Sequence, residues 1–135
     1  MKKLTLFLSL GLMGCSSVIT NSQPVENTNE IKHVCVKQTK SAVFAKALSE
    51  SLNKRNISTE IYQGQPPLSC EYLLAYSLVE EDLVALRAKI RLSSKSEGKA
   101  LGEISYKQRG EEKEKVKKTG VLGQTDLMIN ELFKK

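Results

Sequence analysis

Hydrophobic and polar residues alternate with a period of two over much of the chain, which is the pattern of β-strands. Strands are predicted over residues 31–37, 57–62, 69–79, 83–92 and 99–107. The 69–79 segment carries apolar residues on both faces, so we expect a central strand. The 83–92 segment has one apolar face and one charged face, so we expect helices to cover the first and water to meet the second.

Two other segments follow the helical period. The first helix is predicted over residues 42–55, with Ser41 as its N-cap and Asn56 as a left-handed stop. A second helix is predicted from Thr125, as its N-cap, to Phe133. The apolar stripes consist of Phe44, Ala47, Leu48 and Leu52 in the first helix and of Met128, Ile129, Leu132 and Phe133 in the second.

These elements predict an α+β fold of the β-α-β-β-β-α type. We expect a two-layer sandwich in which one mostly antiparallel sheet carries two helices packed on one face. The strand-helix-strand unit over residues 31–62 predicts two roughly parallel strands joined by a right-handed crossover. The charged run at 109–119 has no apolar period, so we expect a solvated loop or a ragged extension of a strand.

The first residues have the layout of a secretory signal. Lys2 and Lys3 precede an apolar run over residues 4–13, and Gly14 and Cys15 follow at once. We therefore divide the chain into a signal peptide (1–14), a cysteine with a flexible tether (15–30) and a single α+β domain (31–135). The tether is predicted because its residues are polar and show no hydrophobic period.

The sequence Leu12-Met13-Gly14-Cys15 resembles the lipobox of bacterial lipoproteins. The resemblance implies that Cys15 becomes the first residue of the mature protein and carries acyl chains, palmitate among them, that hold it on a membrane. Ser16, in place of an aspartate, implies an outer-membrane address facing the periplasm. The alternative is that Cys15 is a chance cysteine in an ordinary signal peptide.

At several strand and helix positions the sequence resembles a family of small proteobacterial outer-membrane lipoproteins. That family has a βαβββα domain and an uncharacterised function. Strands of that family often carry a tryptophan between the two long β-segments, and residues 83–86 of this chain contain none. The resemblance is carried by the lipobox and by the motifs Cys70-x-Tyr72-x-Leu74-x-Tyr76, Ala88-x-Ile90-x-Leu92, Leu101-Gly102-x-Ile104-x-Tyr106 and Thr125 before Glu131-Leu132-Phe133.

Once Cys15 is assigned to lipid, Cys35 and Cys70 remain as an even pair. An exported protein with such a pair is expected to form one disulfide. The bond would close a loop of about 36 residues and stabilise the fold by on the order of 3 to 4 kcal/mol. The alternative is two buried thiols in neighbouring strands, because the sequence does not give the distance between their Cα atoms.

The charge of the mature chain is modestly positive. Loss of Lys2 and Lys3 leaves 19 of the 21 basic residues against 15 acidic ones, a net charge of +4. This excess favours anionic surfaces such as lipid headgroups or wall polymers, although ordinary solubility explains it as well. It is too small and too dispersed to indicate nucleic acid binding.

The candidate binding face lies on the charged side of the 83–92 strand. Arg87, Lys89 and Arg91 recur every second residue beside Glu103 and Ser105 of the next strand. Such a stripe can bind phosphate or carboxylate groups of an envelope protein or an anionic polymer. The alternative is an exposed strand face whose charges form cross-strand ion pairs.

No constellation of catalytic residues is found, so we expect no enzyme. The single histidine, His33, is a poor base for a triad, and no G-x-S-x-G or glycine-rich phosphate motif is present. His33 and Cys35 share a strand face, but they do not make a usual zinc ligand set, so neither metal nor cofactor is expected. Two hypotheses follow: a membrane-anchored interaction module, or a carrier that holds a lipid or glycan between sheet and helices. A filled core favours the first.

Overall fold

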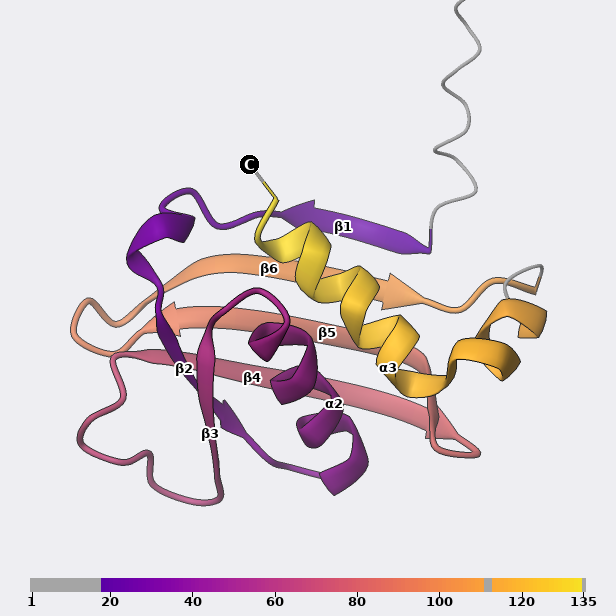
Figure 1. Cartoon of the computed structure of the whole chain (residues 1–135), viewed down its shortest axis with the longest axis horizontal. Coiled ribbons are helices and arrows are strands. Elements are labelled where there is room, and N and C mark those ends of the chain that lie inside the picture. Colours follow the sequence, from indigo (N-terminus) through magenta and orange to yellow (C-terminus); the bar gives the residue numbers. More distant parts are fainter. Residues whose placement is uncertain (1–17, 111–112, 135) are drawn as a thin grey trace, which may run out of the picture.

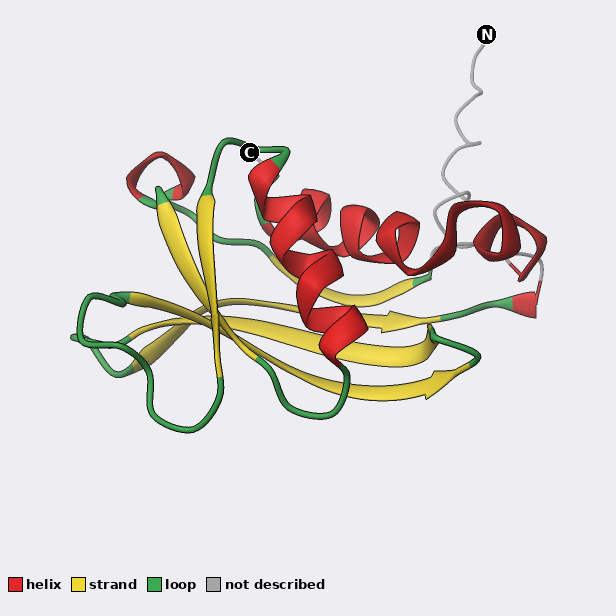
Figure 2. Cartoon of the chain, turned by 60° about the horizontal axis from the view of Figure 1, so that its bottom comes forward, coloured by secondary structure: helices red, strands yellow, loops and turns green. Residues whose placement is uncertain are grey.

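The computed structural model describes residues 18–110 and 113–134 and forms one six-stranded sheet with two helices packed on it (Figure 1). Both helices cover the same face, and the other face is open (Figure 2). The strands are β1 (Ile19–Gln23), β2 (His33–Lys37), β3 (Ser58–Tyr62), β4 (Tyr72–Glu81), β5 (Val84–Ser94) and β6 (Lys99–Lys107). A short 3₁₀ helix, η2 (Thr28–Glu30), precedes β2.

The order of strands across the sheet is β1-β6-β5-β4-β2-β3. β1, β6, β5 and β4 pair antiparallel, whereas β2 is parallel to both of its neighbours, β3 and β4. The predicted α+β class, the mostly antiparallel sheet and the helices on one face are confirmed, and so is the parallel pairing within the first strand-helix-strand unit. All five predicted strands are present, and four of them lie between the helices, so the β-α-β-β-β-α order omits one strand; β1 is an additional strand that precedes them.

The first helix, α2 (Ala42–Asn53), forms where the sequence predicts it. The Ser41 hydroxyl accepts a hydrogen bond from the Phe44 backbone N–H at 3.0 Å, so the predicted N-cap is confirmed. Asn56 has a φ of 65°, the left-handed conformation expected of a stop. The helix ends two residues earlier than predicted, and its apolar stripe is buried on the sheet.

The last helix, α3 (Lys113–Leu132), is much longer than predicted. The charged run assigned to a loop is its first half, and Thr125 is not an N-cap but a fully buried residue within the second half. A kink separates the halves at Gly120, whose φ of 71° and ψ of −165° are outside the helical range and suit a residue without a Cβ. Val116 is the buried contact of the first half.

Strand β1 corrects the prediction that residues 15–30 form a flexible tether. It pairs with β6, Ile19 opposite Tyr106, and adds an edge strand to the sheet (Figure 1). The chain then stays on the domain, because Val25 is 5% exposed and its N–H donates to the Leu132 carbonyl at 2.8 Å. The folded domain therefore begins by residue 19.

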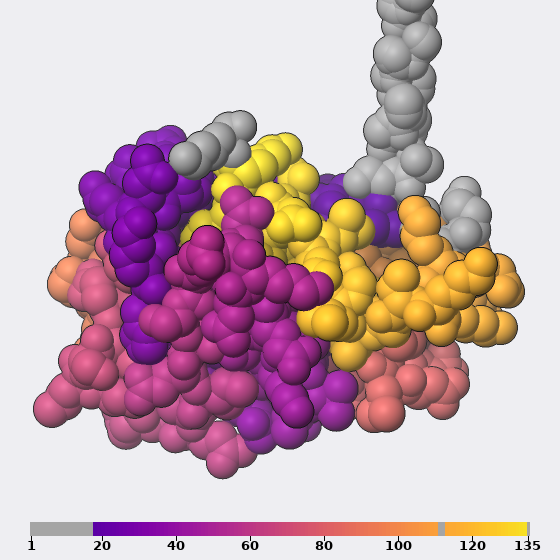
Figure 3. All heavy atoms as spheres, in the orientation of Figure 1, coloured from indigo at the N-terminus to yellow at the C-terminus, as the bar shows by residue number. Residues whose placement is uncertain are grey.

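The space between sheet and helices is filled with apolar side chains. The space-filling view shows α2 and α3 lying against each other over the sheet (Figure 3). Between the helices, Ser51 and Thr125 hydroxyls are 2.7 Å apart, and Lys54 Nζ donates to Asp126 Oδ2 at 2.7 Å. The largest fully buried side chains include Phe44, Leu48, Leu52, Leu74, Ile90, Leu92, Ile104, Met128, Ile129, Leu132 and Phe133.

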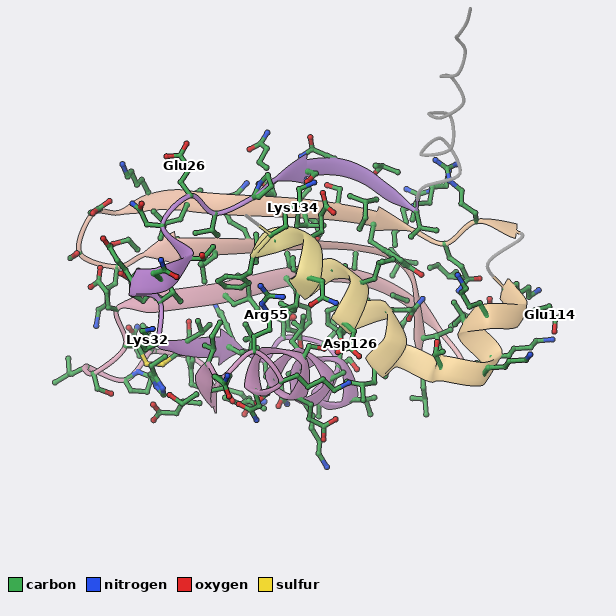
Figure 4. All side chains as sticks on the ribbon, turned by 45° about the horizontal axis from the view of Figure 1, so that its top comes forward. Glu26, Lys32, Arg55, Glu114, Asp126 and Lys134 are labelled. Carbon is green, nitrogen blue, oxygen red and sulfur yellow. A yellow bond between two sulfur atoms is a disulfide. The ribbon has the colours of Figure 1, made fainter. Side chains whose placement is uncertain are left out.

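Arg55, just beyond α2, joins the same end of α2 to the C-terminal end of α3 (Figure 4). Its guanidinium donates to Asn130 Oδ1 and to the Phe133 carbonyl, both at 3.0 Å, and lies 5.9 Å from the centre of the Phe133 ring. These contacts join the C-terminal end of α2 to the second half of α3, and the face of the sheet away from the helices stays open (Figure 2).

Candidate functional site

The three predicted cations lie together on the open face of the sheet. Arg87, Lys89 and Arg91 are exposed on β5, while their sequence neighbours Ala88 and Ile90 are buried under the helices. The alternation of the strand produces this arrangement, because successive side chains point to opposite faces. The sequence prediction places these three side chains correctly.

Glu103, on β6, pairs with two of the three cations. Its Oε1 accepts a hydrogen bond from Arg91 Nε at 2.9 Å and also lies 2.9 Å from Arg91 Nη2, and its Oε2 lies 3.6 Å from Lys89 Nζ. The Glu103 side chain is 17% exposed, while the two cations are about half exposed. One carboxylate thus balances the Arg91 end of the stripe, as the ion-pair alternative expects.

The Arg87 end of the stripe is different. Arg87 lies directly opposite Lys107 of β6, so two like charges face each other across the strand pair. Within residues 18–110 and 113–134, no ion pair joins either side chain to a carboxylate. A shallow hollow of about 590 Å³ lies here between β4, β5 and β6, with Val79, 53% exposed, on its rim. The open face therefore has one uncompensated cationic end.

A second cluster surrounds the cysteines at the opposite side of the sheet. Cys35 and Cys70 form a disulfide with a Cα–Cα distance of 6.0 Å, and both residues are buried. His33, two residues before Cys35, lies on the same face of β2, and the parallel register places Ser58 opposite His33 and Glu60 opposite Cys35. One imidazole, one hydroxyl, one carboxylate and the disulfide therefore meet on one face.

Both ring nitrogens of His33 have partners. Nδ1 lies 2.6 Å from the Ser58 hydroxyl, and Nε2 lies 3.2 Å from Glu60 Oε1. Nε2 is also 3.7 Å from Cys35 Sγ, which in turn is 3.8 Å from Glu60 Oε1. Because Cys35 Sγ carries no proton in the disulfide, it cannot donate to Glu60, and that distance is a close approach and not a hydrogen bond.

The sequence reasoning missed this cluster, although a signal existed. A chain of serine, histidine and carboxylate is the arrangement that activates serine nucleophiles, but His33 and Glu60 here lie on open strand surface, 39% and 46% exposed. The predicted parallel pairing of segments 31–37 and 57–62, aligned residue by residue, would have brought the side chains together.

An apolar groove of about 430 Å³ lies at the end of the molecule where α3 begins. It is lined by apolar side chains from the tip of the β4–β5 hairpin, the start of α2 and both halves of α3, among them Val43, Leu83 and Val121. Leu83 is 62% exposed with a φ of 68°, an unusual conformation for a branched side chain. Asp82, with a φ of 53°, forms the two-residue turn with it.

The predicted lipidation site, Cys15, lies outside the described residues, which begin at Val18. The described part of the chain contains no helix with the length and apolar character required to span a bilayer.

Comparison with solved structures finds, among others, two neighbours of low sequence identity. No family model and no curated protein matches the sequence. A structure of a PelC dodecamer from Paraburkholderia phytofirmans is similar at a TM-score of 0.49 and 11% identity, over 85% of this chain and 95% of the other. A minor lipoprotein from Acinetobacter baumannii is similar at a TM-score of 0.36 and 14% identity, over 74% of this chain and 90% of the other. At these values neither neighbour bears on the function of this chain.

Proposed function

We propose that the protein is a lipid-anchored, non-catalytic interaction module of the bacterial cell envelope. Its open sheet face binds an acidic partner, a protein or an anionic polymer, on the periplasmic side of the outer membrane. The observation that carries the proposal is the unbalanced cationic end of that face, where Arg87 lies opposite Lys107.

The anchor is Cys15, at the end of the apolar run and in the lipobox-like Leu12-Met13-Gly14-Cys15. Two or more acyl chains give stable attachment, whereas one holds a protein only marginally. Because β1 begins at Ile19, four residues after Cys15, an extended chain separates lipid and domain by at most about 14 Å. The domain would therefore lie close to the bilayer surface and not on a long leash.

The cationic end favours an anionic ligand for an electrostatic reason. Like charges directly opposite each other on antiparallel strands destabilise the pair. A carboxylate or phosphate group placed between Arg87 and Lys107 would relieve that repulsion and form charge-assisted hydrogen bonds with both. The exposed Val79 beside them offers apolar contact to the same partner.

The second candidate function is a carrier of a small envelope ligand. The sequence places that ligand between sheet and helices, whereas the groove beside Leu83 is the site that would hold it. The space between sheet and helices is filled, but the groove beside Leu83 has the size of a small-ligand site. A lipid chain is the ligand that its apolar lining suits. Binding of a fluorescent fatty acid that is lost in Leu83→Lys would favour this function over the first.

Photo-crosslinking in cells tests the interaction module. A crosslinking amino acid at position 89 should give a discrete adduct, and one at Lys46, exposed on α2 under the other face, should not. Lys107→Glu should abolish the adduct while preserving the fold, because it places a carboxylate opposite Arg87. Lys46→Glu is the matched charge control. Equal adducts from both faces, or an adduct that survives Lys107→Glu, would contradict the proposal.

A further inference from the structure

The cluster around the disulfide has the donor atoms and the spacing of a metal site. Tetrahedral Zn²⁺ sites with bonds of 2.0–2.3 Å place nitrogen and oxygen ligands about 3.3 Å apart and a sulfur about 3.6 Å from either. The corresponding distances here are 3.2 Å between His33 Nε2 and Glu60 Oε1, and 3.7 and 3.8 Å from Cys35 Sγ to these two atoms. Three donors thus already occupy three corners of a tetrahedron.

Hydrogen bonding around His33 orients its ring for metal binding. The Ser58 hydroxyl donates to the Lys32 carbonyl at 3.2 Å, so its oxygen is free to accept the proton of His33 Nδ1 at 2.6 Å. This tautomer leaves Nε2 with a lone pair that faces the Glu60 carboxylate. In the other tautomer Nε2 carries the proton and donates to Glu60 Oε1 at 3.2 Å, and a metal ion would take the place of that proton. A partner that fixes the second nitrogen is the usual support of a metal-binding histidine.

Cys70 is the fourth candidate ligand, although its sulfur is not among the three donors that lie within 4.8 Å of one another and would have to move to join them. Its Sγ is bonded to Cys35 Sγ, and in a zinc site two thiolates would stand about 3.8 Å apart. The two sulfurs must move apart to reach this distance, and Cys70 belongs to a loop, residues 63–71, outside the regular strands. A disulfide sulfur is a poor ligand, whereas a thiolate is among the best for Zn²⁺.

We infer that the cluster binds one Zn²⁺ ion when the disulfide is reduced, so that disulfide and metal are alternative ways of joining the same two cysteines. The four ligands are Cys35, Cys70, His33 and Glu60. A dithiol reductant supplies two electrons and two protons to the S–S bond and becomes a disulfide itself. Binding of Zn²⁺ to the two resulting thiols then releases both protons to solvent.

Zinc is favoured over other ions by the ligand set. Two thiolates, an imidazole and a carboxylate suit a tetrahedral, borderline-soft cation, whereas Mg²⁺ and Ca²⁺ prefer oxygen ligands. The imidazole and carboxylate are about 40% exposed and give an entry path, while the sulfurs form the buried floor of the site.

Cobalt titration of the purified full-length protein tests the inference. Reduced protein, freed of reductant without oxygen, should take up one equivalent of Co²⁺ with tetrahedral d–d bands and a thiolate charge-transfer band, and Zn²⁺ should displace it. Ser58→Ala removes a residue that only hydrogen-bonds a metal ligand, so it should weaken Co²⁺ binding by roughly 10–100-fold. His33→Gln and Glu60→Gln each remove a ligand and should weaken Co²⁺ binding by more than that. Glu50→Gln, on the exposed side of α2, is the matched control and should bind normally.

Absence of the bands in reduced, folded protein would overturn the inference. Unchanged Co²⁺ affinity in both His33→Gln and Glu60→Gln would overturn it too, because the thiolates alone would then account for binding. If reduction unfolds the protein, Zn²⁺ should restore its circular dichroism spectrum, since binding energy becomes folding energy in such sites. Failure of Zn²⁺ to refold the chain would equally count against it.

Discussion

Gly102→Ala should destabilise the protein, because Gly102 is where the N-terminal segment crosses β6. A Cβ at position 102 would lie 2.8 Å from Val25 Cγ2 and 2.9 Å from the Gln23 carbonyl oxygen, and 3.0 Å from Leu132 Cδ1. Contacts this short with a backbone atom force the segment or α3 to shift. Overpacking of this kind costs about 1–3 kcal/mol.

Part of that cost is offset in the unfolded state. Replacing glycine by alanine stabilises a protein by about 0.4–1 kcal/mol when the native backbone accepts alanine. The net loss should therefore be about 1–2 kcal/mol, which lowers the Tm of a domain of this size by roughly 3–10 °C. Urea unfolding and thermal denaturation followed by circular dichroism measure both quantities.

Gly110→Ala is the matched control, because among residues 18–110 and 113–134 no atom beyond the chain neighbours lies within 4 Å of where its Cβ would be. It should change stability by less than about 0.5 kcal/mol. If Gly102→Ala proves as stable as Gly110→Ala, residues 19–25 do not pack on the sheet. The prediction of a flexible tether would then be correct for this segment.

Two further substitutions test contacts that close the domain. Glu131→Gln should lower stability at neutral pH only, because hydrogen bonds from Lys134 and then Ser22 hold the pKa of the Glu131 carboxyl below its ordinary value. That stabilisation is present above the unfolded-state pKa and is lost as pH falls through the lowered, folded-state pKa, so urea midpoints of variant and wild type should converge in acid. Gln124→Leu should cost about 1–3 kcal/mol in urea unfolding, since it leaves the buried Ala85 N–H, now 2.8 Å from Gln124 Oε1, without its acceptor.

Each of these two has its own control. A stability difference for Glu131→Gln that stays constant with pH would show that the charge of Glu131 is not the cause. Gln108→Leu removes only a second donor to the Ala85 carbonyl, at 3.3 Å, and should cost less than Gln124→Leu. Equal costs would mean that the buried N–H is not the decisive group.

The sheet and the first helix could be predicted because local pattern and tertiary burial agree there. Alternation in 83–92 placed Arg87, Lys89 and Arg91 on the open face, and a Ser41 cap with an apolar stripe placed the helix. The alternation slips only at the β-bulge near Ala85, which is buried although the pattern assigned it outward.

The missed elements lack a local apolar signal. Strand β1, Ile19–Gln23, is polar after its first residue, and its place is set by pairing with β6 and by the open position at Gly102. The first half of α3 buries only Val116, so it has no repeating apolar stripe from which a helix could be predicted. Its lysines and glutamates favour a helix only through their intrinsic helix propensity. Gly120 then interrupts the pattern that would have joined both halves.

The candidate sites divide in the same way. The cationic stripe lies within one strand, so sequence reasoning found it, but the opposition of Arg87 and Lys107 depends on the β5–β6 register. The Cys35–Cys70 bond was an open alternative because it depends on a distance, 6.0 Å between Cα atoms. His33, Ser58 and Glu60 come together through the residue-by-residue register of the parallel pair β2–β3, and the sequence predicts the pairing but not its register.

The central claim, that lipid on Cys15 holds this domain at the envelope, is tested most directly by replacing the sulfur. Cys15→Ser should incorporate no labelled palmitate and should leave the membrane fraction in a flotation gradient, while the wild type is labelled and floats. A Cys15→Ser protein that still takes up label and floats with the membranes would contradict the account.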